Sequence, residues 1–459
     1  MMSTVTPPPK AEARRPATDG WLWGIVVLAI ALRIAAVCTF SGELNKDRDA
    51  YLGIARAVAA GDGFSTPGST RPTAYRPPLY PLLLAPISGT DQLWLRAGLQ
   101  VALGAGTVLL TWVAARRLTE PACSPSRHSA AWTHRIAAGI VAIDPMLLLY
   151  TPQMMTETLA TFLAAAVLAL GMSPPVSWSR SRQIAIGAGL GLACLCRPTF
   201  LPGAALWALW IAWTGLRPSR REAASSPLAN APAAERLRRL PWLALLALGL
   251  TIAPWPIRNQ LRFGRPIVTT THGGYTLLLS NNPVYYAEVV RAPWGTVWAA
   301  DSLDRWQREQ TELAAAAGAR GEIAEDRWYS DQARAWIGTH PREFLEASLH
   351  RVRSFWKLAP SGEGAGQGNA VRNRIIAVYY GLQFGVALCG LVGVLRRRDG
   401  RFALPLLLIL SLTALHAVYF SNARMRAPLV PALALLASGC GLFRRSESAA
   451  APSDEARNT

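Results

Sequence analysis

The sequence predicts an all-α membrane protein with about ten transmembrane helices and two large loops on the outer side of the membrane. The chain of 459 residues is 51% hydrophobic and only 16% charged, with 17 tryptophans, which is too apolar for a soluble protein of this size. Apolar runs recur along it, several reaching the roughly 20 residues that a helix needs to cross the hydrocarbon core. Two segments, about 41–91 and 258–373, are far longer than a connection requires.

The apolar runs define ten expected spans. The first, WLWGIVVLAIALRIAAVCTF, is expected to stay in the chain rather than be cleaved as a signal peptide, because it is too long, Arg33 interrupts it and no small-residue cleavage site follows. The runs lie at about 21–40, 92–115, 136–150, 157–172, 184–196, 199–216, 241–257, 375–395, 402–420 and 427–443. The shorter runs are expected to be buried among their neighbours or tilted.

The distribution of basic residues predicts the orientation. The expected inner loops carry clusters such as Arg116-Arg117 and Arg396-Arg397-Arg398, whereas the short outer loops 151–156 and 421–426 hold only Arg424 and Arg426. Lys and Arg are enriched in short cytoplasmic loops, so both termini are expected in the cytoplasm. The net charge of +19 follows mostly from this topology, and we expect no nucleic-acid partner.

Composition also predicts the domain organisation. Residues 1–20 and 446–459 are polar and predict disordered cytoplasmic tails, which leaves 21–445 as one transmembrane domain. The segment 217–239, RPSRREAASSPLANAPAAERLRR, predicts a polar cytoplasmic linker. None of the six cysteines falls in an outer loop, so no disulfide framework is expected. No metal site is predicted, although a divalent cation remains compatible with the sequence.

The first outer loop places charged residues directly after a span. Asp47, Asp49 and Tyr51 open a predicted helix, DAYLGIARAVAAG, whose single apolar stripe favours a position flat on the membrane surface. Two interpretations of the aspartates stay open, since negative charge is also favoured at a helix N-terminus. The next stretch, RPTAYRPPLYPLLLAP, is stiffened by prolines that fix the direction of Arg76, which suits an anionic head group.

Several motifs in this order resemble the GT-C superfamily of glycosyltransferases. The resemblance is to bacterial proteins related to protein O-mannosyltransferases, lipid A aminoarabinose transferases and the RgtA/B/C/D-like enzymes, and it covers about residues 21–440. In chain order the motifs are Asp47-x-x-x-Tyr51 with Gly61-x-Gly63-Phe64 and YRPPLYP, then TPQMMTETL, CRPTF, PWPIRN, THGGYTLLLSNNP, WIGTHPREFL with RVRSFW, and SNARMRAPLVP. One departure is that the acidic pair of the protein mannosyltransferases is interrupted here by Arg48, which weakens the expectation of a protein acceptor.

The resemblance implies transfer of a sugar from a polyprenyl-phosphate donor to an extracytoplasmic acceptor, which is a glycolipid, a glycan or a protein, in a bacterial-type inner membrane. Attack of a hydroxyl at the anomeric carbon needs a general base, which a carboxylate supplies. The phosphate leaves already charged, so fixed cations replace a general acid. The expected inventory is one base carboxylate and several arginines, with inversion in a single displacement, unlike the paired carboxylates of retaining glycosidases.

The candidate residues follow from these motifs. Asp47 is the expected base, with Asp49 in reserve. Glu157 is a third catalytic candidate, because an acidic group at the end of a span is costly and is usually functional. Pairing with Arg197 is the alternative role of Glu157. Guanidinium groups match phosphate oxygens, although each arginine also suits an anchor for its span. The expected donor- and phosphate-binding residues are Arg76, Arg258 and Arg424 with Tyr51, then Arg197, Arg262 and Arg426; the expected substrate-binding residues are Tyr75, Asn259, Asn281 and Asn282.

Two other classes compete with a glycosyltransferase that uses a lipid-phosphate sugar. A lipid-linked glycan polymerase or ligase also has many spans and a large outer loop, but it usually lacks Asp-x-x-x-Tyr after the first span. A lipid-sugar transporter should show inverted repeats and broken helices near the midplane, and the sequence has no clear repeat. A degenerate relative that only binds lipid is a further alternative, against which the retained carboxylates argue.

Overall fold

The computed structural model describes residues 20–119, 127–173, 178–216, 240–360 and 370–448. Regular secondary structure in these residues is helical, apart from an isolated antiparallel bridge between Ser65 and Pro72. The expected all-α class is therefore confirmed for the described chain. The predicted linker at 217–239 and nearly all of both predicted tails lie outside the described residues.

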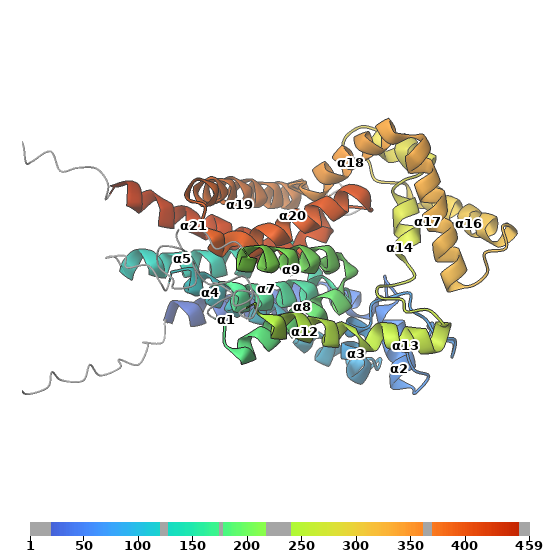
Figure 1. Cartoon of the computed structure of the whole chain (residues 1–459), viewed down its shortest axis with the longest axis horizontal. Coiled ribbons are helices and arrows are strands. Elements are labelled where there is room, and N and C mark those ends of the chain that lie inside the picture. The colour runs from blue at the N-terminus through green and yellow to red at the C-terminus, as the bar shows by residue number, and fades with distance from the viewer. Residues whose placement is uncertain (1–19, 120–126, 174–177, 217–239, 361–369, 449–459) are drawn as a thin grey trace, which may run out of the picture.

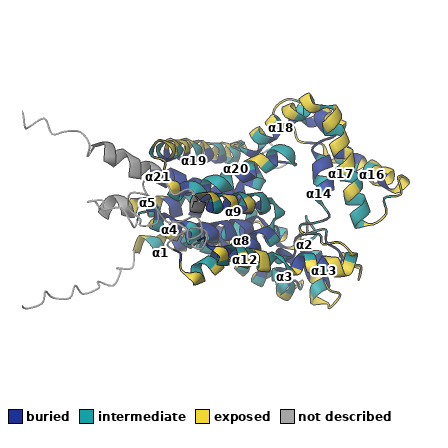
Figure 2. Ribbon diagram, in the orientation of Figure 1, coloured by how far each residue is buried: buried dark blue, intermediate teal, exposed yellow. Residues whose placement is uncertain are grey.

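A bundle of helices runs along the long axis of the molecule (Figure 1). Helix α8 packs closely on α12, α4 lies between α1, α5 and α7, and α19 packs on α21. Most dark-blue, buried ribbon lies within this bundle (Figure 2). Its members are α1 (Gly20–Thr39), α4 (Leu93–Thr119), α5 (Arg127–Ala142), α7 (Glu157–Gly171), α8 (Arg180–Cys196), α9 (Leu201–Leu216), α12 (Trp242–Ile252), α19 (Ala370–Arg397), α20 (Ala403–Val418) and α21 (Val430–Ser448).

Four stretches among the described residues, and not ten, are long and apolar enough to cross a membrane. They are α1, α4, α19 and Gly400–Val418, which contains α20. The expected count treated apolar runs as whole spans, but several of them form shorter helices: α7 has 15 residues, α8 has 17 and α12 has 11. At 1.5 Å per residue, 17 residues reach only about 25 Å. Prolines explain two of the ends, because α8 stops just before Pro198 and α12 just before Pro254.

Small residues and one buried arginine explain how the bundle packs. Gly187 and Gly191 lie one turn apart on α8, and a Cβ at either position would collide with α12, which Ala244 and Thr251 bring up against them. Such spacing lets two helix backbones approach closely. Arg33 interrupts the first apolar run, yet it is buried and donates to the backbone oxygens of Ala29 at 3.1 Å and Ala142 at 3.2 Å.

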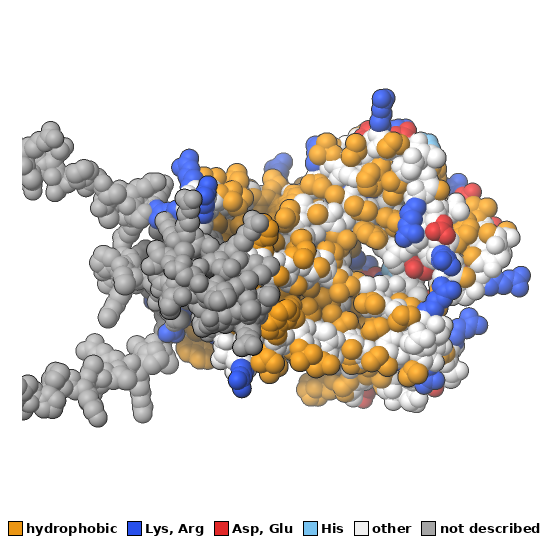
Figure 3. Space-filling view, in the orientation of Figure 1, with side chains coloured by type: hydrophobic (Ala, Val, Ile, Leu, Met, Phe, Trp, Pro, Cys, Tyr) orange, Lys and Arg blue, Asp and Glu red, His pale blue; other side chains and the backbone are white. Residues whose placement is uncertain are grey.

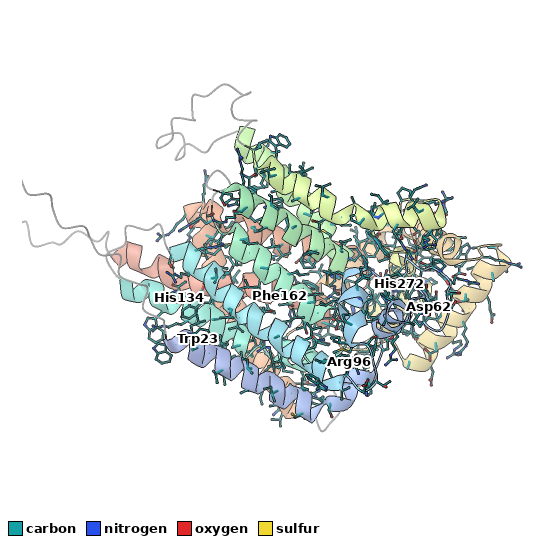
Figure 4. All side chains as sticks on the ribbon, turned by 90° about the horizontal axis from the view of Figure 1, so that it is seen from below. Trp23, Asp62, Arg96, His134, Phe162 and His272 are labelled. Atoms are coloured by element: carbon teal, nitrogen blue, oxygen red, sulfur yellow. The ribbon has the colours of Figure 1, made fainter. Side chains whose placement is uncertain are left out.

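The remaining helices lie at one end of the bundle, the outer end in the predicted topology. Helices α2 (Tyr51–Ala59), α3 (Leu79–Leu84) and α13 (Pro254–Phe263) lie near the ends of α8 and α12, and a second group projects beyond them (Figure 1). This second group contains α14 (Gly273–Leu279), α15 (Pro283–Tyr285), α16 (Ala300–Ala316), α17 (Glu322–Thr339) and α18 (Pro341–Phe355). Figure 4 places Asp62 and His272 at this end, with Trp23 and His134 at the opposite end.

The expected position of α2 flat on the membrane surface is wrong. Leu52, Ile54 and Ala55 on its apolar side are buried, and α2 packs against α3 and the turn that follows it. An amphipathic stripe of this length covers a protein surface as well as a lipid surface, and here the protein supplies the cover. The loop is thereby held rigidly against the end of the bundle.

Candidate functional site: a charged cluster at the outer end

Five charged side chains from four separate segments meet at the outer end of the bundle. We call this group the charged cluster. It comprises Asp49 and Arg76 from the first outer loop, Glu157 from the start of α7, Arg197 from the end of α8 and Arg424 from the turn between α20 and α21. Each of the four segments contains one of the motifs on which the resemblance is based.

Glu157 is the buried centre of the charged cluster. It is the first residue of α7, only 3% of its side chain is exposed, and its Oε1 lies 3.5 Å from Arg197 Nη1 and 3.2 Å from Arg424 Nε. Arg197 directly follows the last turn of α8 in extended backbone. Arg424 stands in a 3-10 turn that Asn422 caps by accepting a hydrogen bond from the Arg424 amide at 3.1 Å.

Asp49 links the first loop to the same cluster. Its Oδ1 lies 3.6 Å from Arg76 Nη2, and its Oδ2 lies 3.7 Å from Arg424 Nη1. Arg76 also donates from Nε to the Asp49 carbonyl at 2.7 Å, and its guanidinium lies over the rings of Tyr51 and Tyr75 at 5.3 and 4.7 Å. Burial raises the pKa of Tyr51 to about 12, so its hydroxyl stays neutral beside the arginines.

The charged cluster carries more positive than negative charge. Three arginines face two carboxylates, which leaves a surplus of one positive charge when all five are ionised. The Arg424 side chain is 25% exposed, so its guanidinium is reachable from outside, and Figure 3 shows a hollow on this side between the bundle and the outer helices. Partly exposed guanidiniums with a surplus cation suit an anion, and guanidinium matches phosphate oxygens bidentately.

Asp47, the expected base, lies outside these ion pairs. Its Oδ1 accepts a hydrogen bond from the Leu52 amide at 3.0 Å, and its Oδ2 accepts one from the Gly53 amide at 2.6 Å. It therefore caps the first turn of α2, which agrees with the helix-terminus interpretation. Among the described residues it makes no ion pair, whereas Asp49 and Glu157 both do. Ala50, which follows Asp49, has a φ of 61°, and this left-handed turn separates Asp49 from the start of the helix.

Five other predicted binding residues are held by internal contacts. Arg258 donates to the carbonyls of Thr73 and Phe64, and Arg426 donates to those of Phe355 and Lys357. Asn259, Asn281 and Asn282 are buried, and their amides donate to backbone carbonyls. These contacts give each of the five side chains a structural role.

His272 and Tyr75 lie next to Arg76. The His272 ring meets the edge of Tyr75 at 4.4 Å and stacks on Tyr275 at 4.9 Å. Burial, together with the nearby Arg76, lowers the pKa of His272 to about 3, so the imidazole is neutral at physiological pH. The second-choice Arg262 is exposed on α13. No group of three His, Cys, Asp or Glu side chains suited to a metal ion is found in the described part of the chain.

Sequence reasoning missed two acidic residues of α17: Glu322, which joins α17 to the first loop, and Asp326, which joins it to α14. Glu322 accepts from the Thr73 hydroxyl at 2.8 Å and the Ala74 amide at 2.7 Å, and Asp326 accepts from the Gly274 amide at 2.6 Å. Both stand in the first turns of α17, where carboxylates are common for local reasons. The sequence therefore gives no signal for either role; the structure shows that a Cβ at Gly274 would collide with the Asp326 carbonyl.

Comparisons with known proteins found structural similarity alone. No protein-family model matches the sequence, and no curated protein matches it. One similar solved structure is the archaeal oligosaccharyltransferase AglB from Archaeoglobus fulgidus in complex with an inhibitory peptide and a dolichol-phosphate, with a TM-score of 0.46 and 13% identity over 95% of this chain and 52% of that chain. An Archaeoglobus fulgidus oligosaccharyltransferase tethered with an acceptor peptide has a TM-score of 0.48 and 12% identity over 94% and 50% of the two chains.

A third similar structure is ArnT from Cupriavidus metallidurans bound to undecaprenyl phosphate. Its TM-score is 0.40, with 15% identity over 94% of this chain and 80% of that chain. The present chain spans about half the length of the oligosaccharyltransferases it matches. All three similarities extend over nearly the whole of this chain at low sequence identity.

Proposed function

We propose that the chain is a multi-pass membrane glycosyltransferase of the GT-C type. It would transfer a sugar, with inversion, from a polyprenyl-phosphate donor to an acceptor on the outer side of a bacterial-type inner membrane. The observation that carries the proposal is the charged cluster, in which three arginines and two carboxylates converge beside a hollow at the outer end of an apolar bundle. In this proposal residues 21–445 form one domain, the helical bundle lies in the membrane and both termini are cytoplasmic.

The phosphate of the donor would bind to Arg424 and Arg76. Both guanidiniums are held by Asp49 at 3.6 to 3.7 Å, which is longer than a strong charge-assisted hydrogen bond, so a phosphate competes well for their N–H groups. Arg197 is less exposed and pairs with Glu157. It would add positive potential from behind, and Glu157 would position Arg197 and Arg424 rather than touch the sugar.

Asp47 remains our choice for the general base. Asp49 and Glu157 are both engaged by arginines, whereas Asp47 makes hydrogen bonds only with the Leu52 and Gly53 amides among the described residues. Those two amides fix the direction of the carboxylate and leave its remaining lone pairs available, because a carboxylate accepts about four hydrogen bonds. In the proposed step the acceptor oxygen loses its proton to Asp47 and attacks the anomeric carbon. The bond to the phosphate oxygen breaks, and its electron pair leaves with the phosphate.

The test compares the surface glycans and lipid-linked sugars of cells by mass spectrometry, with and without the gene. We expect that cells lacking the gene lose one surface sugar and accumulate a lipid-linked monosaccharide, and that wild type restores both. Asp47→Asn should restore less than about a hundredth of the transfer, the usual contribution of a general base. Asp62→Asn, which changes an exposed carboxylate of the same loop, serves as the matched control and should restore it fully.

Other outcomes would identify the competing classes. Accumulation of a lipid-linked oligosaccharide in cells without the gene would indicate a polymerase or ligase. Full restoration by Asp47→Asn with loss in Asp49→Asn would move the base by two residues. Full restoration by both variants would contradict the proposed chemistry and favour a lipid-binding or transport role.

A further inference from the structure

The outward side of α18 presents large apolar side chains that no described element covers. Leu345 and Leu349 are 67% and 65% exposed, and their spacing of four residues puts them on the same side of the helix. The opposite side is buried through Ala347, Arg351 and Phe355. Both sides of α18 therefore carry apolar residues, and only one side is packed against the protein.

Basic and aromatic residues flank these leucines. The guanidinium of Arg353 lies 4.3 Å from the ring centroid of Trp294, and Lys357 Nζ lies 5.1 Å from it, while Trp294 itself is 46% exposed. Arg342 is exposed in the first turn of the helix. We call this surface the α18 face, defined by Trp294, Arg342, Leu345, Leu349, Arg353 and Lys357.

Two carboxylates near the α18 face share one arginine, Arg291. Glu343 lies 3.0 Å from Arg291 and 4.0 Å from His340, and Glu346 lies 4.0 Å from Arg291. Arg291 and these two carboxylates together carry one negative charge. Arg342, Arg353 and Lys357 carry three positive charges, so the α18 face and these neighbours are positive in sum. An anionic partner is therefore favoured over a neutral or cationic one.

The α18 face lies where the bundle ends. Helix α18 packs on α20, and Arg351 donates to the carbonyl of Ala417, next to the last residue of α20, at 2.8 Å. Figure 1 shows α18 beyond the outer ends of α19 and α20, inclined to the bundle axis and reaching past its side. In the proposed topology, a helix in this position would overhang the lipid that surrounds the bundle, at the level of the head groups.

We propose that the α18 face binds anionic phospholipid in the outer leaflet. Exposed leucines on one side of a helix insert into the boundary between head groups and acyl chains, tryptophan prefers that same layer, and Lys and Arg bind anionic head groups. A second copy of this chain, or another protein, would need acidic residues to match the basic residues of the α18 face. The experiment below distinguishes such a protein contact from lipid. The proposal rests on the membrane topology proposed above, but not on the proposed chemistry.

This contact has a structural consequence for the outer helices. On the buried side of α18, Arg351 donates to the Ser280 carbonyl at 2.6 Å and to Asn281 Oδ1 at 3.2 Å. Those residues follow α14, which packs against α17, and α17 holds the first loop through Glu322. Lipid bound to α18 would therefore fix the height of the outer helices above the charged cluster.

The first experiment measures depth with a nitroxide spin label in nanodiscs of phosphatidylglycerol and phosphatidylcholine. Leu349→Cys carries the label on the α18 face, and Leu313→Cys carries it on α16, where Leu313 is similarly exposed at 48%. Labelled wild-type protein supplies the background from native cysteines. We expect collisions with oxygen to exceed those with an aqueous nickel chelate severalfold at 349, and the reverse at 313. A water-exposed label at 349, or one shielded from both reagents as in a protein interface, would overturn the proposal.

The second experiment measures lipid preference by native mass spectrometry of protein extracted from an equal mixture of the two lipids. Arg353→Gln and Lys357→Gln should each lower the preference for phosphatidylglycerol by about fivefold, since one basic residue near an anionic surface contributes about 1 kcal/mol. Arg320→Gln, which removes a charge just before α17 and away from the α18 face, is the control and should change nothing. Equal lipid preference in wild type and both α18 variants would remove the anionic part of the proposal.

Discussion

Replacing Glu157 by glutamine should have opposite effects on folding and on phosphate binding. The substitution keeps the size of a side chain that is 97% buried but removes the negative charge that faces Arg197 and Arg424. Removing one partner of a buried ion pair typically costs about 3–5 kcal/mol. Here Arg424 retains Asp49 and both guanidiniums are partly exposed, so we expect a loss of about 2 kcal/mol in the free energy of unfolding.

The same substitution raises the surplus charge of the cluster from one to two. A unit charge about 7 Å from a phosphate interacts by about 2 kcal/mol at an effective dielectric constant of about 20, and solvent at the exposed arginines reduces this further. A gain of about 1 kcal/mol corresponds to a roughly fivefold lower dissociation constant. Glu157→Gln should therefore bind undecaprenyl phosphate more tightly while its ligand-free form melts at a lower temperature.

The assay measures thermal midpoints and undecaprenyl phosphate affinity of the purified protein in nanodiscs. Glu43→Gln is the matched control, because Glu43 pairs with Lys46 and Arg48 at the surface, where an ion pair contributes about 0–1 kcal/mol, and it should leave affinity unchanged. Weaker phosphate binding by Glu157→Gln at a preserved midpoint would refute the counter-ion role. It would instead indicate that the carboxylate mainly holds Arg197 and Arg424 in the geometry that binds phosphate.

Three further predictions concern other residues. Arg424→Lys should weaken phosphate binding about tenfold with little change in the thermal midpoint, because lysine lacks the fork that matches phosphate. Arg426→Lys should instead lower the thermal midpoint and leave phosphate binding unchanged, because among the described residues Arg426 donates to the carbonyls of Phe355 and Lys357. Equal effects of the two substitutions in both assays would contradict their separate roles. The pKa of His272 is about 3 in the folded chain, against 6.5 when it is unperturbed, so the unfolded state binds a proton that the folded state does not. The free energy of unfolding should therefore fall as the pH drops below 6.5. His272→Phe should make this fall smaller in thermal midpoints measured between about pH 7 and 4.5. Ser69→Cys should react with an impermeant thiol reagent in intact cells and Ser181→Cys should not, and the opposite result would invert the proposed topology.

The sequence predicted which segments form the site better than which side chains do. Asp49, Glu157, Arg197 and Arg424 lie in motifs that were expected together, and they meet. Arg426 lies in the same turn as Arg424 but donates to backbone carbonyls instead. Local sequence describes both arginines alike, because each follows a small or apolar residue in a proline-containing outer turn. Only the tertiary partner, a carboxylate for Arg424 and a backbone carbonyl for Arg426, distinguishes the two.

The helices show the same limit. Hydrophobic runs predicted the bundle, because burial of apolar residues leaves a strong periodic or continuous signal. The runs did not predict where each helix ends, since Pro254 ends α12 inside a continuous apolar stretch. The stripe on α2 and the leucines of α18 are similar patterns, yet the first is covered by protein and the second is exposed. Periodicity shows that one face of a helix is apolar. Whether protein or lipid packs against that face depends on elements far away in the chain.

The carboxylates of the charged cluster explain how three arginines are held in place before any ligand arrives. Guanidiniums a few Å apart repel one another, and at an effective dielectric constant of about 20 each such pair costs about 2–3 kcal/mol. Asp49 lies between Arg76 and Arg424, and Glu157 lies between Arg424 and Arg197, so each carboxylate offsets the repulsion of one neighbouring pair. Because Glu157 is buried and Asp49 is partly exposed, a phosphate arriving from outside would displace only the second carboxylate. The arginines would then need little rearrangement, and the cost of ordering them would already have been met in the folded chain.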